Sequence, residues 1–363
     1  MKKKVIHFIF NLGRGGAETI TVGVANELSE YENIVVTLFP QNHFGDELHC
    51  DKLICLNLGS LFSLPFAVFK FHKLVRKEKP DIVHTHLFWP TIIARLSVPK
   101  RIPLVTTIHA FIATSVEYTH WHIRFLDKFT YRVRKSIIAA DAKGALDEYF
   151  SFLKLKPYKA FPLYTFVDTN RFKLENIPAR VPSPVFRLIS VGALRLQKNY
   201  SYLVRAFAKL KDKPIELHIY GSGNLQQELQ KQIDESGAKI ILKGEEKNIE
   251  KIIPLYDLYV MSSSFEGFSL SVLEAMAMGM PLLLSDIISF KEQCEGVAGF
   301  FSLADPDDFV KKVTALSETT PEELKQKGQK ARERAINNFT LAHHMEVVRK
   351  IYSEALQDVE TKA

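Results

Sequence analysis

Two short apolar runs enclose the sequence Ser264-Phe-Glu-Gly-Phe-Ser-Leu-Ser-Val-Leu-Glu-Ala-Met-Ala-Met-Gly-Met-Pro281. We predict that these runs, Leu258 to Met261 and Pro281 to Leu284, are buried strands. The segment between them should form a helix that begins near Ser269, because serine is a favourable N-cap residue. The helix should end at Gly279, which is followed by a helix-stopping proline. A strand, a helix and another strand in succession are typical of a parallel α/β sheet.

Two glutamates lie eight residues apart in this stretch. Glu266 precedes the predicted helix, and Glu274 lies about a turn and a half into it among apolar residues, where a carboxylate needs a polar partner. The first backbone amides of the helix should be free to bind an anion, and they belong to Gly267, Phe268, Ser269 and Leu270. A nucleotide sugar could therefore present phosphate to the amides and hydroxyls to both carboxylates. The structural alternative is that Glu266 caps the helix and Glu274 forms a buried ion pair.

Length and composition indicate a two-domain protein. The chain has 363 residues, of which 46% are hydrophobic, and this exceeds one ordinary core of ~150 to 200 residues. No apolar run approaches the ~18 residues of a membrane span, and Met1 to Lys4 is followed by a strand-like run instead of a signal peptide. We therefore expect a cytoplasmic protein. The spacing of its three cysteines fits neither a disulfide framework nor a zinc site; they are Cys50, Cys55 and Cys294.

The order of apolar runs predicts two Rossmann-like doubly wound domains of the α/β class, facing a cleft. The first domain, residues 1–165, should contain strands at Val5–Phe10, Ile34–Phe39, Leu53–Leu58, Asp81–His86, Leu104–Ile108 and Ser136–Ala140. The proline-containing stretch 154–184 is interpreted as the crossing between domains. Residues 185–340 should form the second domain, with strands at Phe186–Val191, Ile215–Tyr220, Ile240–Leu242, Leu258–Met261, Pro281–Leu284 and Phe300–Leu303. The C-terminal segment 341–363 contains an amphipathic helix.

Several polar groups follow predicted strands of the first domain, at the edge where parallel sheets bind ligands. Gly15 and Gly16 lie where the first helix begins, and glycine there allows close approach of a ligand to the backbone. His109 ends a later strand, and His84 and His86 end the strand before it. For His84 and His86 we favour the ordinary interpretation, in which both bond to the backbone.

In the second domain, two cations follow the first strand. Arg195 and Lys198 could neutralise a diphosphate leaving group, a task that a metal ion performs in other transferases. The sequence Asp305-Pro-Asp307 has the shape of a metal-binding motif, but it precedes a helix, so we expect Asp305 to be an N-cap. We predict no metal and no cofactor, because a nucleotide sugar would be a substrate.

The first half of the chain is basic. Residues 1–180 hold 25 Lys and Arg against 16 Asp and Glu, a balance of +9, whereas the whole chain carries +7. In the segment Tyr118–Lys135 an aromatic ridge runs beside a basic one; the two ridges consist of Trp121, Phe125 and Phe129 and of Arg124, Lys128 and Arg132. Phe62–Lys79 repeats this pattern more weakly. Either the segment docks on an anionic membrane, or its aromatics face the sheet and its cations lie in water.

The sequence E-G-F-S-L-S-V-L-E-A-M-A-M-G-M-P, from Glu266 to Pro281, resembles the E-x7-E signature of retaining GT-B glycosyltransferases of family four. The resemblance extends over essentially the whole chain. It implies that Glu266 contacts the hydroxyls of the donor sugar and Glu274 the ribose, while the amides of residues 267–270 contact the diphosphate. It also implies that helix 341–363 crosses back to pack on the first domain.

Other positions match the family less completely. Gly15 to Glu18 resembles its G-G-A-E loop, whose amides reach toward the donor diphosphate or the acceptor, so Gly15 and Gly16 are predicted to bind the donor. His109 resembles the residue that approaches the donor sugar, although Ala110 follows it where the family has Asp. Lys198 with Asn199 matches, whereas Ala193 occupies the usual arginine position, so the arginine role is assigned to Arg195. The stretches Tyr220–Gly223 and Lys243–Gly244 resemble loops that border the nucleotide base.

The resemblance implies a retaining, metal-independent glycosyltransferase that moves a sugar from a nucleoside diphosphate to a glycan or lipid-linked acceptor in surface polysaccharide biosynthesis. We expect a cytoplasmic enzyme with an anionic surface of the inner plasma membrane as an optional partner, and no nucleic acid. Two alternatives remain open. One is another GT-B enzyme, a sugar-nucleotide epimerase or a phosphorylase, and the other is a non-catalytic module that binds anionic surfaces through its basic half.

Overall fold

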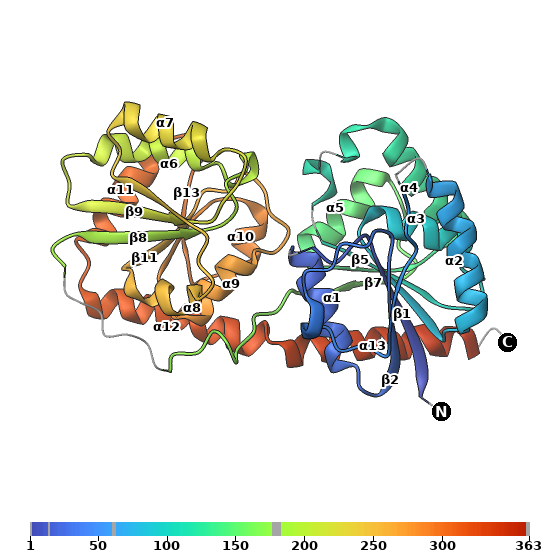
Figure 1. Cartoon of the computed structure of the whole chain (residues 1–363). Helices are drawn as coiled ribbons and strands as arrows, with labels where there is room; N and C mark the ends of the chain where they lie inside the picture. The colour runs from blue at the N-terminus through green and yellow to red at the C-terminus, as the bar shows by residue number, and fades with distance from the viewer. Residues whose placement is uncertain are drawn as a thin grey trace. The chain divides into compact units, whose positions relative to one another are not determined.

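The computed structural model describes residues 2–13, 15–59, 63–109, 111–115, 117–175 and 183–360. The chain divides into two compact units, Met1–Thr165 with Leu341–Ala363, and Phe166–Thr340. Each unit contains a parallel sheet covered by helices (Figure 1), so the prediction of two doubly wound α/β domains is confirmed. Some positions used in the predictions lie outside the described residues, namely Phe62, Ala110, residues 176–182 of the proline-containing stretch, and 361–363.

The first unit has a seven-stranded sheet in the order β3-β2-β1-β4-β5-β6-β7. Its strands are β1 Lys3–Ile9, β2 Tyr31–Thr37, β3 Lys52–Cys55, β4 Ile82–His86, β5 Leu104–Ile108, β6 Ile137–Ala140 and β7 Ala160–Pro162. Its helices are α1 Gly16–Glu27, α2 Leu64–Glu78, α3 Phe88–Ser97, α4 Trp121–Val133, α5 Lys143–Leu153 and α13 Leu341–Glu360. Chain order reverses between the adjacent strands β1 and β4, and such a switch point is where parallel sheets bind ligands.

Alternating strand residues bury both faces of this sheet. Phe8 on β1 stacks against Phe71 on α2, with ring centroids 4.0 Å apart, and the same core includes Ile93 on α3. On the opposite face, His84 on β4 bonds to Tyr352 on α13. Figure 1 shows α2, α3 and α4 grouped together and α13, in red, along the other side of the sheet. The C-terminal helix is therefore part of the first unit.

The second unit has a six-stranded sheet in the order β10-β9-β8-β11-β12-β13. Its strands are β8 Phe186–Val191, β9 Ile215–Tyr220, β10 Ile240–Gly244, β11 Leu258–Met261, β12 Leu282–Ser285 and β13 Gly299–Phe301. Its helices are α6 Tyr200–Phe207, α7 Gln226–Ser236, α8 Ile249–Ile252, α9 Leu270–Ala277, α10 Ile288–Gln293, α11 Pro306–Ser317 and α12 Pro321–Asn338. In this sheet the strand order reverses between the adjacent parallel strands β8 and β11.

Helices α9 and α12 pack closely in the second unit. A Cβ on Gly328 of α12 would collide with the backbone carbonyl of Gly279, which lies two residues beyond the last residue of α9. Gly279 also has a φ of 67°, which favours glycine. The predicted end of the helix at Gly279 therefore serves both a left-handed turn and a close backbone contact.

One strand was missed in the proline-containing stretch. The interpretation of residues 154–184 as the domain crossing is wrong at its start, where β7 pairs with β6 and Ala160 lies opposite Ile138. The strand has three residues and occupies the sheet edge, so it shows no alternating pattern, and an edge position tolerates Pro162.

Helix α11 begins as predicted. The side chain of Asp305 accepts a hydrogen bond from the backbone N of Asp307 at 2.9 Å, and Pro306 occupies the first turn. Capping by Asp305 is confirmed. None of the helices that the structure describes has the length and apolar character needed to cross a lipid bilayer.

The aromatic ridge of α4 faces away from the sheet. Trp121 is 72% exposed, Phe125 61% and Phe129 49%. The buried side of α4 is formed by other residues, Ile123, Asp127, Thr130 and Tyr131. The alternative in which the aromatics face the sheet is therefore wrong.

Candidate active site

In the second unit, Glu266 forms an ion pair with Lys198. Oε1 of Glu266 lies 2.7 Å from Nζ of Lys198 and accepts a hydrogen bond from Oγ of Ser263, also at 2.7 Å. Oε2 accepts a hydrogen bond from Nε2 of Gln197 at 3.2 Å. Since Glu266 is only 8% exposed, three donors hold a nearly buried carboxylate in one orientation.

Two neighbouring strands bring this pair together. Lys198 follows β8 and Glu266 follows β11, at the switch point of the second sheet. The loops are also joined directly, because Oγ of Ser262 donates a hydrogen bond to the carbonyl oxygen of Lys198 at 2.9 Å. Contacts between the ends of two neighbouring strands therefore hold the two residues of the ion pair together.

The loop after β8 packs against the loop after β9 through backbone alone. A Cβ on Gly221 would collide with the carbonyl of Gly192, and a Cβ on Gly223 with that of Leu194. The backbone N of Leu194 donates a hydrogen bond to the carbonyl of Ser222 at 2.9 Å. These contacts fix the loop that carries the two predicted cations.

Glu274 lies on α9 without a counter-ion. Its side chain forms no ion pair or hydrogen bond with any residue that the structure describes. Burial raises the pKa of its carboxyl to about 7, against the lowering effect of positive charges on Arg171 and Lys198. The buried ion pair considered as the alternative is therefore absent from the described part of the chain, and a ligand hydroxyl could satisfy the carboxyl.

The raised pKa of Glu274 predicts a pH-dependent stability difference. Between pH 4.5, the ordinary pKa of this group, and about 7, the folded chain binds the proton more tightly than the unfolded chain. The group's contribution to the free energy of unfolding should therefore fall as the pH rises through this window. Glutamine does not titrate, so Glu274→Gln has no such loss. The free energy of unfolding of the variant, relative to that of the wild type, should therefore be about 2 kcal/mol higher at pH 8 than at pH 5.

Urea unfolding of the two proteins at both pH values measures this difference. The control is Glu322→Gln, which changes an exposed glutamate of α12 and should alter the free energy of unfolding by no more than about 0.5 kcal/mol. An effect of Glu274→Gln that does not vary with pH would contradict the raised pKa.

The amides at the start of α9 are only partly available. Gln293 on α10 accepts a hydrogen bond from the Ser269 backbone N at 3.0 Å and donates one to the Ser269 carbonyl at 2.8 Å. The prediction that the Ser269 amide is free for a diphosphate is therefore wrong, because a distant side chain satisfies it. The amides of Gly267 and Leu270 form no hydrogen bond within the described ranges of the chain. They are the remaining candidates for anion binding.

Three other predicted donor-binding residues belong to the second unit. Arg195 is exposed after β8. Gly244 ends β10 with a φ of 72°, and its carbonyl accepts a hydrogen bond from the backbone N of Gly221 at 2.8 Å. The ring of Phe268 is buried against Phe339, with centroids 5.0 Å apart, so this side chain anchors the start of α9.

In the first unit, the glycine-rich turn leads into α1. Gly15 is the N-cap residue and Gly16 the first residue of the helix, and both are exposed. The carboxylate of Glu18 lies over Gly15, where a Cβ would collide with it. Arg14 lies outside the described residues.

Histidines gather at the switch point of the first sheet. Nδ1 of His86 lies 3.2 Å from Nε2 of His109. His84 bonds to the hydroxyls of Tyr352 at 2.8 Å and Thr107 at 2.7 Å. The predicted backbone bonds of His84 and His86 are therefore wrong: the partners come from neighbouring strands and from α13, because the strand backbone already bonds within the sheet.

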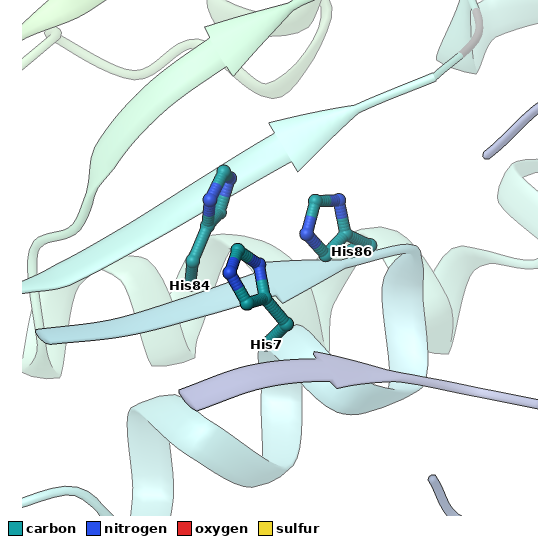
Figure 2. A group of neighbouring side chains, drawn as sticks. All are labelled: His7, His84 and His86. Atoms are coloured by element: carbon teal, nitrogen blue, oxygen red, sulfur yellow. The ribbon is translucent and has the colours of Figure 1, made fainter. Parts of the chain in front are cut away.

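Figure 2 shows the rings of His7, His84 and His86 close together on strands β1 and β4. One nitrogen of each lies within 4.8 Å of the others, an arrangement that could hold a metal ion. Burial lowers the pKa of His7 to about 4 and holds the pKa values of His84 and His86 well below the ordinary value. Burial also lowers the pKa of the neighbouring His109 to about 3. The rings are thus neutral near pH 7, but a metal would have to displace the hydrogen bonds of His84.

A cavity of about 450 Å³ adjoins His109 in the first unit. Aromatic side chains, including Phe88 and Trp89 from the start of α3, form much of its wall, and Glu117 and Asp127 add carboxylates. A cavity of this size, with apolar walls and a few polar groups, suits a small organic ligand.

Two protein-family models match the chain. One, described as Glycosyltransferase Family 4, matches residues 14–171, and the other, described as Glycosyl transferases group 1, matches residues 176–334. The chain belongs to glycosyltransferase family 4. The family inferred from the residues between Glu266 and Pro281 is therefore confirmed.

This glycosyltransferase has characterised relatives. It is 28% identical over 321 residues to the N-acetylgalactosamine-N,N'-diacetylbacillosaminyl-diphospho-undecaprenol 4-alpha-N-acetylgalactosaminyltransferase of Campylobacter jejuni, covering 83% of this chain and 86% of the relative. It is 26% identical over 326 residues to the UDP-Gal:alpha-D-GlcNAc-diphosphoundecaprenol alpha-1,3-galactosyltransferase of Escherichia coli, covering 82% and 81%.

Solved structures share its fold. A glycosyltransferase from Rickettsia africae superposes with a TM-score of 0.82 at 17% identity, over 98% of this chain and 99% of the other. Anabaena HepE in complex with UDP-glucose gives a TM-score of 0.81 at 17% identity, over 96% and 99%. At these identities the likeness shows the fold alone, and it confirms the GT-B class for this glycosyltransferase.

Sequence reasoning missed several polar residues of the glycosyltransferase sites. Gln197, Ser263 and Gln293 orient Glu266 or Ser269, yet they match no motif. Gln197 lies beside Lys198 in the sequence, and this position was the one available signal. His7 lies 77 residues from His84, and only the pairing of β1 with β4 places them side by side.

Proposed function

We propose that this glycosyltransferase transfers a sugar from a UDP-sugar to a lipid-linked glycan acceptor in surface polysaccharide biosynthesis. The observation that carries the proposal is the pair of glutamates: Glu266 is ion-paired to Lys198 at 2.7 Å, whereas Glu274 is half-buried and forms no ion pair or hydrogen bond with any residue that the structure describes. A nucleotide sugar needs both groups: a charged group near the reacting sugar, and a hydrogen-bond acceptor for the ribose hydroxyls. UDP is preferred as the carrier because the E. coli relative is named for UDP-Gal.

The proposed mechanism is front-face transfer with retention of configuration. The bond between the anomeric carbon and the diphosphate breaks, and Lys198, Arg195 and the start of α9 neutralise the departing charge. The acceptor hydroxyl attacks from the same side and gives its proton to a diphosphate oxygen. The alpha linkages in the names of both relatives support retention, because an alpha-linked donor then yields an alpha-linked product.

We assign the acceptor to the first unit. Both relatives are named for acceptors on a diphospho-undecaprenol carrier. The cavity beside His109 offers aromatic walls, on which sugar rings pack, together with polar groups that could orient a hydroxyl. The neutral His109 ring would contact the substrates as a hydrogen-bonding group. Such a reaction would take place at the cytoplasmic face of the membrane and without nucleic acid.

The proposed transfer requires no metal or cofactor. Nζ of Lys198 is held 2.7 Å from the carboxylate of Glu266 on a half-buried side chain, and exposed Arg195 follows β8 on the same loop. These two cations can supply the charge that a divalent ion supplies to a diphosphate in other transferases.

The test uses the purified full chain. Thermal stabilisation by a panel of nucleotide sugars should identify the donor, and UDP-sugars should stabilise it most. The identified donor is then incubated with a diphospho-undecaprenol-linked sugar, and NMR of the product should show an alpha linkage. Product should form equally well with excess chelator.

Three results would overturn parts of the proposal. A beta-linked product would exclude retention. Activity that is lost in chelator and restored by magnesium or manganese would exclude metal independence. An epimerised sugar or free sugar formed from donor without acceptor would favour the alternative of another GT-B enzyme, an epimerase or a phosphorylase.

A further inference from the structure

The exposed aromatic side chains of the protein are concentrated on two helices. Within the described residues, six Phe, Tyr and Trp side chains are exposed, and five of them lie on α2 and α4. These five are Phe66, Phe69, Trp121, Phe125 and Phe129. Helix α3 lies between α2 and α4 on the same face of the first sheet and adds the exposed Leu96 (Figure 1). A grouped set of exposed apolar side chains indicates an interaction surface.

All the exposed charge on these helices is positive. Helices α2 and α4 carry seven Lys and Arg and only two acids, Glu78 and Asp127, and α3 carries no acid. Both acids point inward: Glu78 is 9% exposed and paired with Lys52, and Asp127 is 2% exposed and paired with Arg95. The outward side of the three helices therefore presents aromatic and cationic groups without an opposing carboxylate.

The order of these groups around α4 is specific. Trp121, Phe125 and Phe129 recur every four residues, roughly opposite the buried residues of the helix, so the aromatic ridge is its outermost part. Arg124, Lys128 and Arg132 follow the same spacing beside it. An aromatic ridge with cations beside it suits the boundary between lipid headgroups and acyl chains, where the rings can lie at the boundary and the cations can contact phosphates.

We propose that the outward side of α2 and α4 docks the first unit on an anionic phospholipid bilayer. The aromatic rings enter the headgroup boundary, and the cations contact lipid phosphates. A second copy using the same surface fits poorly, because two uniformly positive faces repel each other. A nucleic acid fits less well than a bilayer, because its phosphates would need cations, not aromatic rings, at the outermost position.

The docking surface continues into the wall of the cavity beside His109. Glu117 and Tyr118 line that cavity and precede Trp121, the first residue of α4, by four and three residues. Docking through α4 would thus bring the cavity to the membrane. The docking itself does not depend on the proposed transfer reaction, and its test uses lipid binding alone.

The experiment is sedimentation of the full chain with vesicles. The vesicles are made of phosphatidylcholine alone or of phosphatidylcholine and phosphatidylglycerol in equal parts. The wild type should bind only the anionic vesicles, and binding should weaken from 0.1 to 1 M salt as the screening length falls from about 10 to about 3 Å. Changing Arg124, Lys128 and Arg132 together to Glu should lower the partition coefficient by roughly a hundredfold.

A matched variant separates local docking from net charge. Lys325, Lys327 and Lys330 are exposed on α12 of the second unit, and their joint change to Glu alters the net charge by the same amount. This control should retain binding within roughly threefold. A further variant, Trp121→Ser with Phe125→Ser, should also lose binding, whereas Ile288→Ser on α10, which removes another exposed apolar side chain, should not. Thermal unfolding temperatures verify that each variant is folded.

Several outcomes would overturn the proposal. One is equal binding to both vesicle types, and another is equal loss in the α4 and α12 triple variants. Self-association without vesicles that the α4 triple variant abolishes would assign the surface to a second copy of the chain. Binding to a single-stranded oligonucleotide in preference to anionic vesicles at the same salt would assign it to nucleic acid.

Discussion

A Glu266→Gln variant should transfer sugar roughly a hundredfold more slowly than the wild type or worse, with a much smaller loss of nucleotide affinity. The carboxylate is nearly buried and accepts hydrogen bonds from Lys198, Ser263 and Gln197. A neutral amide of the same shape cannot accept at both of its terminal atoms, and it removes the negative charge beside the Lys198 ammonium. The substitution should therefore slow the breaking of the bond between the sugar and its leaving group, and it should change the nucleotide affinity much less.

Initial rates and nucleotide titrations measure the two effects separately. Glu235→Gln is the control, because Glu235 forms an exposed ion pair with Lys231 at 3.7 Å and its loss should leave both quantities unchanged. Glu274→Gln should show the reverse pattern of Glu266→Gln, with weaker nucleotide binding as its main effect. A Glu266→Gln enzyme with the wild-type rate would remove Glu266 from the mechanism.

An Asp127→Ala variant should lose about 3 to 5 kcal/mol of unfolding free energy. Oδ1 of Asp127 lies 2.5 Å from Nη1 of Arg95 and accepts a hydrogen bond from the Tyr149 hydroxyl at 2.8 Å, while Oδ2 accepts one from the Tyr118 hydroxyl. Both charged groups are at most 3% exposed. Removing the carboxylate leaves a buried guanidinium without a counter-charge and frees two tyrosine hydroxyls.

Urea unfolding measures this loss, and two further variants test its cause. Asp147→Ala changes an exposed aspartate of α5 and should remain within about 0.5 kcal/mol of the wild type. The double variant Arg95→Met with Asp127→Leu replaces both charges by apolar groups and should recover much of the stability. If the double variant is as unstable as Asp127→Ala, the loss comes from packing and not from the unpaired charge.

Most of the fold could be predicted from the sequence, because a buried parallel strand is a short apolar run and each such run precedes an amphipathic helix. Strands β5, β8, β9 and β11 have the predicted boundaries. Strand β7 was not found, since three residues at a sheet edge carry too little apolar pattern. Asp305 was correctly predicted as a cap, because capping depends on residues within one turn.

The site was predicted in its residues but not in its contacts. Spacing along the chain indicated Glu266, Glu274 and Lys198, because a motif combines residue types that lie near one another in the sequence. Whether the Ser269 amide is free depends on Gln293, which lies 24 residues away on another helix. A residue from a different element leaves no periodic or local signal, so the sequence could not show that this amide is occupied.

The sequence by itself determined that α4 has an aromatic ridge and a basic ridge, because helical periodicity fixes which side chains share a face. Only the tertiary structure decided which face is buried. The inward face is set by Asp127, whose carboxylate pairs with Arg95 on α3 and bonds to Tyr149 on α5. A helix turns toward the partners that satisfy its buried polar groups, and those partners come from distant parts of the chain. The aromatic residues Trp121, Phe125 and Phe129 consequently face outward.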